Sequence, residues 1–98
     1  MINRVPAIFD TDLLIAGCTT GAVDAALAAR ETGKSVLCIT HHTYPGEDLC
    51  SHLRLWPNPD QKPRTELARR LFADALENGG CLTPMALKLG LETAMLDA

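Results

Sequence analysis

Residues 12–40 decide the fold, and they read DLLIAGCTTGAVDAALAARETGKSVLCIT. Asp12 to Ala16 form a short strand-like run that is continuously apolar after Asp12, and Ser35 to Thr40 form a second such run. Runs of this kind are typical of parallel strands that are covered on both faces. Between them lie a small-residue turn and a segment from Ala22 to Thr32 whose many alanines favour a helix. A strand–helix–strand crossover of this length is almost always right-handed and joins parallel strands.

The rest of the chain predicts a loop and two helices. Residues 41–62 are rich in proline and polar residues, which is typical of a loop. Within residues 63–98, the segment from Thr65 to Asn78 has apolar side chains at helical spacing. Thr83 and Pro84 then form a usual helix opening, and an apolar stripe continues to Leu96. The predicted fold class is therefore α/β, with a partial Rossmann-like βαβ unit of parallel strands in residues 12–40, followed by two helices.

Two parallel strands are too few for a complete sheet of this class. A parallel sheet buries both of its faces and usually has several strands. We therefore expect an incomplete domain across residues 1–98, which is either a piece of a longer protein or completes its sheet with a partner chain. The lead-in from Met1 to Thr11 alternates poorly and either covers a sheet edge or frays.

Composition excludes several classes of partner. Ninety-eight residues make at most one small domain, and the net charge of -3 supplies no basic surface for nucleic acid. No apolar run approaches the ~20 residues that span a bilayer, so no membrane is expected as a partner. The four cysteines form no CxxC pair, and the first residues do not resemble a signal peptide. We expect reduced thiols and a cytoplasmic protein.

The turn after the first strand has the features of a pyrophosphate-binding turn. Gly17 allows a sharp reversal, Thr19 stands at the second glycine position and Ala22 at the third, where alanine is accepted. The helix that follows directs its first amides at the anion. An acidic residue for the ribose hydroxyls is expected at the end of the second strand, where Thr40 stands instead. The candidate cofactor-binding residues are Gly17, Cys18, Thr19, Thr20, Gly21, Ala22, Thr40 and His41.

At these residues the chain resembles the N-terminal part of FAD-dependent oxidoreductases of the glutathione-reductase-like class. It is similar to the branch whose turn is glycine–x–threonine–x–x–small, and the likeness extends through Tyr44 to Cys50 and Leu53 to Trp56. It covers most of this chain but only the first quarter or so of such an enzyme. The resemblance implies a Rossmann domain that binds the ADP and pyrophosphate part of FAD. It also implies that catalysis needs a missing C-terminal part, so the catalytic residues remain unknown here.

Other functions stay open at this stage. The alternative of a different class is a non-catalytic βαβ fragment or interaction module that binds no nucleotide, which Thr40 and the missing strands favour. NAD or another nucleotide is a third possibility, although no acidic residue stands at Thr40 and no basic residue follows it directly. A metal site is not expected, because the spacing of His41, His42, Cys50 and His52 matches no zinc pattern.

Overall fold

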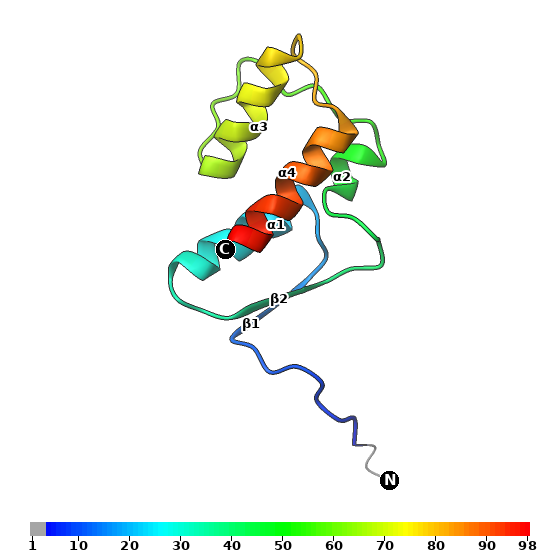
Figure 1. Ribbon diagram of the computed structural model, residues 1–98, viewed down its shortest axis with the longest axis vertical. Coiled ribbons are helices and arrows are strands. Elements are labelled where there is room, and N and C mark those ends of the chain that lie inside the picture. The colour runs from blue at the N-terminus through cyan, green and yellow to red at the C-terminus, as the bar shows by residue number, and fades with distance from the viewer. Residues whose placement is uncertain (1–3) are drawn as a thin grey trace.

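The computed structural model describes residues 4–98, so the first three residues of the predicted lead-in and domain lie outside the described part. The elements in chain order are β1 (Leu13–Ala16), α1 (Thr20–Glu31), β2 (Val36–Ile39), α2 (Glu47–Cys50), α3 (Glu66–Glu77) and α4 (Pro84–Asp97). The described part is thus a mixed α/β structure with a two-stranded parallel sheet and four helices (Figure 1). None of these helices is long and apolar enough to cross a membrane.

The sheet confirms the predicted parallel strands. β1 and β2 pair in parallel, from Leu13 opposite Val36 to Ala16 opposite Ile39, and α1 connects them. The Gly17 amide donates to the Ile39 carbonyl, which continues the ladder one residue past β1. The carboxyl ends of both strands therefore lie side by side, where the α1 turn begins.

α1 begins two residues earlier than the predicted start at Ala22. Thr19 is the N-cap, and its Oγ1 accepts a hydrogen bond of 3.1 Å from the Ala22 amide. A capping hydroxyl satisfies an amide that has no partner within the helix, so the helical turn can form directly after Thr19. Thr19 thus has a local capping role in addition to its place in the predicted pyrophosphate-binding turn.

One face of the sheet is open among the described residues, so the prediction of strands covered on both faces is wrong here. Side chains alternate along a strand, and the register places Leu14, Ala16, Leu37 and Ile39 on one face. On this face Leu14 is 60% exposed and Ile39 is 51% exposed. The helices gather on the other side of the two strands (Figure 1). We call these four residues the open sheet face.

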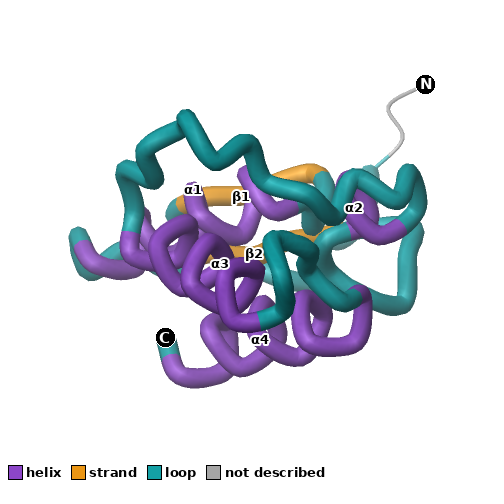
Figure 2. The backbone as a smooth tube through the Cα atoms, turned by 90° about the horizontal axis from the view of Figure 1, so that it is seen from above, coloured by secondary structure: helices purple, strands orange, loops and turns teal. Residues whose placement is uncertain are grey.

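The core lies among the helices. Its fully buried side chains are Val23 of α1 and Leu87 and Leu91 of α4. Leu67 and Leu71 of α3 join them, as the helical spacing predicted. The predicted opening of the last helix is confirmed, with Thr83 at the N-cap and Pro84 as the first residue. Figure 2 shows how the helices cluster beside the strands.

The predicted loop of residues 41–62 contains a one-turn helix, α2. Gly46 precedes it with a left-handed φ of 84°, and its amide donates to the Cys18 carbonyl at 2.8 Å. A Cβ at Gly46 would lie 2.7 Å from Cδ1 of Leu91, and a φ of 84° is strained for any residue with a Cβ, so glycine is favoured between the turn and α4. Glu47 and Asp48 then open the helix, where acidic side chains suit the helix dipole. Gly46 thus fixes α2 against the α1 turn.

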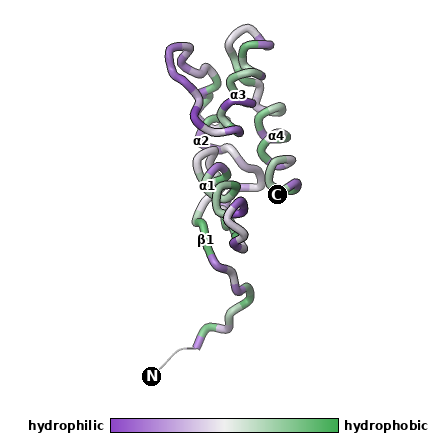
Figure 3. Tube along the Cα trace, turned by 90° about the vertical axis from the view of Figure 1, so that its left-hand side faces the viewer, coloured by the Kyte–Doolittle hydropathy of each residue, from purple (hydrophilic) through white to green (hydrophobic). Residues whose placement is uncertain are grey.

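Residues 4–11 leave the rest of the molecule as an extended segment, which we call the arm (Figures 1 and 3). Val5, Ile8 and Phe9 are 87%, 84% and 69% exposed. Figure 3 shows hydrophobic stretches along the arm and at β1. Within the described part of the predicted lead-in, residues 4–11 therefore cover neither edge of their own sheet.

Candidate functional site

The turn between β1 and α1 leaves its backbone open to an approaching group. Gly17 has a φ of 122°, which L side chains rarely adopt. A Cβ built on Gly17 or Gly21 would meet no atom within 4 Å. Both glycines therefore border open space, as close approach of a ligand to the main chain requires.

The first amides of α1 divide into two groups. Thr19 satisfies the Ala22 amide through its side chain and the Val23 amide through its carbonyl, at 3.1 and 3.0 Å. The amides of Cys18, Thr19 and Gly21 have no acceptor anywhere in residues 4–98. Unpaired main-chain donors at a helix start favour anions, both by hydrogen bonding and through the helix dipole.

Asp48 is a residue of this site that the sequence reasoning missed. Its Oδ1 accepts from the Thr20 amide and from the Thr20 hydroxyl, each at 3.0 Å. α2 carries this carboxylate, and the bond from Gly46 to Cys18 holds α2 in place. The available signal was the acidic pair directly after Pro45 and Gly46, a pattern typical of a helix start.

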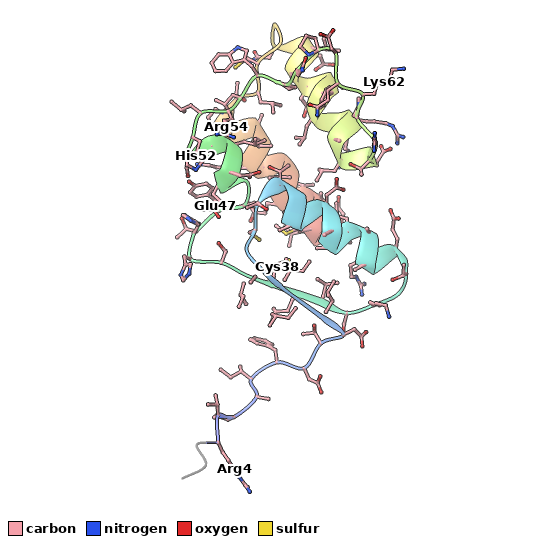
Figure 4. The ribbon with its side chains drawn as sticks, turned by 180° about the vertical axis from the view of Figure 1, so that it is seen from behind. Arg4, Cys38, Glu47, His52, Arg54 and Lys62 are labelled. Carbon is pink, nitrogen blue, oxygen red and sulfur yellow. The ribbon has the colours of Figure 1, made fainter. Side chains whose placement is uncertain are left out.

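Thr40 and His41 follow β2 and are both exposed. The Thr40 Oγ1 accepts from the His42 amide at 3.1 Å, so this hydroxyl already bonds to its own loop. The Nε2 of His42 contacts the carboxylate of Glu47, a pair that is ionic only when the histidine is protonated. Glu47, labelled in Figure 4, is the first residue of α2 and follows the loop after β2. Because Ala16 pairs with Ile39, Thr40 lies one residue past the strand end that adjoins the turn.

Six of the predicted site residues, those from Gly17 to Ala22, thus form one continuous turn and helix start. A hydrogen bond between strand ends brings β2 to this turn, but none joins the turn to Thr40 or His41 within the described residues.

A cavity of about 460 Å³ begins at Thr20 and Gly21 and continues between α1, α3 and the segment before α3. Trp56 and Phe72 contribute aromatic walls, and Arg54 supplies a cation. The volume falls within the usual range of small-molecule sites. Trp56 is 68% exposed and lines this cavity.

The cysteines near the turn are free thiols. Burial raises the pKa of the Cys38 thiol, and the neighbouring Cys18 raises it further. Burial also raises the pKa of Cys50, against a lowering effect of Lys88. A raised pKa keeps a thiol protonated at neutral pH, and the protonated form is a poor nucleophile. Neither thiol is thus prepared for nucleophilic catalysis.

Comparison with protein-family models, with curated protein sequences and with solved structures finds no match to this chain.

Proposed function

We propose that residues 12–48 are the N-terminal FAD-binding segment of a Rossmann-like oxidoreductase domain and hold the ADP and pyrophosphate part of the cofactor. The observation that carries this proposal is the group of three unpaired amides at Cys18, Thr19 and Gly21 beside the open turn at Gly17. A parallel strand pair with a connecting helix is the setting in which such a turn binds a dinucleotide.

The residues present fit a pyrophosphate at this turn. Gly17 and Gly21 leave space for its oxygens, and the unpaired amides can donate to them. The carboxylate of Asp48 takes the Thr20 amide and repels a second anion, so it confines the pyrophosphate to the other amides. Thr40 and His41 are the proposed contacts at the ribose end.

The flavin, when bound, supplies the hydride chemistry. The residues described here bind and orient the nucleotide half, and we propose that the groups around the reacting ring lie outside residues 1–98. We also propose a cytoplasmic setting, which the four free cysteines support.

Binding tests this proposal directly. The protein is titrated by calorimetry with FAD, ADP and adenosine, alone and together with any sequence that continues the domain. We expect saturable binding of FAD and ADP but much less of adenosine, because the turn recognises the phosphates. If FAD shows no binding even with the domain completed, the proposal is wrong.

A second candidate is an interaction module that binds no nucleotide. The bonds from Thr20 to Asp48 favour it, because an internal carboxylate already serves as the anion of the helix start. Asp48→Asn removes the charge and keeps an oxygen acceptor for Thr20. If ADP and FAD fail to bind to this variant as well, the interaction module is the better interpretation.

A further inference from the structure

The cavity between α1, α3 and the segment before α3 extends well beyond the turn at Thr20 and Gly21. Three of the side chains that line it belong to the core and are at most 8% exposed, namely Leu67 and Leu71 of α3, and Leu82. A ligand in the cavity would therefore touch apolar core side chains, which are the usual lining of small-molecule sites. The nucleotide contacts at the α1 turn leave this interior unused.

Hydrogen bonds fix the loop that forms one side of the cavity. The Arg54 amide donates to the Leu49 carbonyl at 2.9 Å, and the Leu82 amide donates to the Leu55 carbonyl at 2.6 Å. Leu55 is buried, and Leu53 has a left-handed φ of 54°, which residues with a Cβ seldom adopt. Such conformations gather at binding sites, where the surrounding structure imposes them. The two residues that flank Leu55 therefore start from a fixed backbone, which lowers the entropic cost of binding.

One of these two residues is Trp56, which presents an aromatic ring to the cavity. Its side chain lines the cavity and is 68% exposed, and Phe72 of α3, which is half-buried, lines it as well. Aromatic rings pack favourably in offset-stacked or edge-to-face arrangements with a second ring. The shape and chemistry of this part of the cavity therefore favour a planar aromatic group.

The other flanking residue is Arg54, the cation among the described residues that line the cavity (Figure 4). Arg54 has no ion-pair partner within residues 4–98. The carboxylate that lines the cavity, Asp24, already accepts a hydrogen bond of 2.6 Å from the Thr65 hydroxyl. An unpaired guanidinium suits a carboxylate, because its planar fork can donate two parallel hydrogen bonds to the two oxygens.

We propose that this cavity binds a small planar aromatic acid, whose ring packs against Trp56 and Phe72 and whose carboxylate pairs with Arg54. The volume of about 460 Å³ accommodates such a ligand. This site goes beyond the proposed nucleotide contacts and does not depend on them.

Nuclear magnetic resonance on the isotope-labelled full chain tests the proposal. The probe is cinnamate, and cinnamamide is its uncharged analogue of nearly the same shape. Trp56 is the only tryptophan in the sequence, so its indole N–H gives a single signal that needs no further assignment. We expect cinnamate to shift this signal and the main-chain amide signals of residues 67–72 in a saturable manner at millimolar concentrations or below. Cinnamamide should bind more weakly.

Two variants separate the ring contact from the charge contact. Arg54→Gln should weaken cinnamate binding about tenfold and leave cinnamamide nearly unchanged, because only the acid pairs with the guanidinium. Trp56→Leu should weaken both ligands severalfold, measured at the main-chain amides, because both present the same ring. Arg70→Gln is the matched control, since Arg70 is an exposed arginine of α3 that does not line this cavity. All three side chains are exposed, so circular dichroism should show an unchanged fold.

Several outcomes would overturn the proposal. They are the absence of saturable cinnamate binding, signal shifts that spare Trp56, an equal loss of both ligands in Arg54→Gln, and an equal effect of Arg70→Gln. Displacement of cinnamate by ADP would assign the cavity to the nucleotide and would overturn the proposal as well. The titration itself contains no nucleotide, so failure of cinnamate to bind is distinct from failure of FAD to bind.

Discussion

Replacing Gly21 by alanine should change stability and nucleotide binding in opposite directions. Gly21 is the second residue of α1, and an added Cβ meets no protein atom within 4 Å. Alanine therefore fits the fold without a clash. The same methyl group would stand in the open space that we assign to the pyrophosphate. A change that harms binding while it helps folding cannot be explained by general damage to the protein.

The magnitude on stability follows from helix propensity. Glycine within a helix costs about 0.5–1 kcal/mol relative to alanine, and Gly21 lies in the first turn, so we expect a gain near the lower figure. For a domain of this size, a gain of about 0.5 kcal/mol raises the Tm by roughly 2–4 °C. For binding we expect at least a tenfold loss of FAD affinity, which corresponds to about 1.4 kcal/mol.

Thermal unfolding and FAD titration measure the two effects on one preparation. Gly90→Ala is the matched control, because Gly90 lies within α4 and its added Cβ also meets no atom within 4 Å. The control should gain at least as much stability, because Gly90 lies in the interior of α4, and it should keep its FAD affinity. If Gly21→Ala gains stability but binds FAD as the wild type does, the pyrophosphate does not lie at this turn and our reasoning fails.

Three further changes test the surroundings of the turn. Gly46→Ala should lower the free energy of unfolding by about 1–3 kcal/mol in a urea titration, because the Cβ of the new alanine would lie 2.7 Å from Leu91. A variant as stable as the wild type would contradict this packing. Asp48→Asn removes a negative charge that repels anions at the start of α1, so this variant should bind ADP more tightly than the wild type at low salt. The gain in affinity should fade at high salt, because salt screens the charge. A gain that does not depend on salt would refute the electrostatic cause. Burial raises the pKa of the Cys38 thiol above its ordinary value of 9.0, so the stabilisation from this protonated thiol is complete below pH 9 and is lost as the pH rises through the raised pKa. The free energy of unfolding should therefore fall above pH 9, and it should fall less steeply in Cys38→Ser. An identical slope in both proteins would contradict this effect of Cys38.

Local patterns predicted most of the elements because they depend on neighbouring residues. The apolar runs of β1 and β2 and the helical spacing in α3 are such patterns. α2 was missed because a single turn has too few residues for a period to show. Its position depends on Gly46 contacting Leu91, a residue 45 positions later in the chain, and no local pattern reports such a contact.

The turn from Gly17 to Ala22 was identified from its residue types and its place between a strand and a helix. Which of its amides remain available could not be identified in that way. Thr19 takes one amide as a cap, and Asp48 takes another from a helix 28 residues away in sequence. The available donors are those that remain after these bonds.

The sequence by itself determined the parallel strand pair, its connecting helix and the glycine turn, because strand and helix periods and turn chemistry are properties of adjacent residues. Only the tertiary structure decided that Asp48 enters the turn, that one sheet face stays open and that the arm points away from it. These features arise where segments distant in sequence meet or fail to meet, and that outcome depends on the packing of the whole chain.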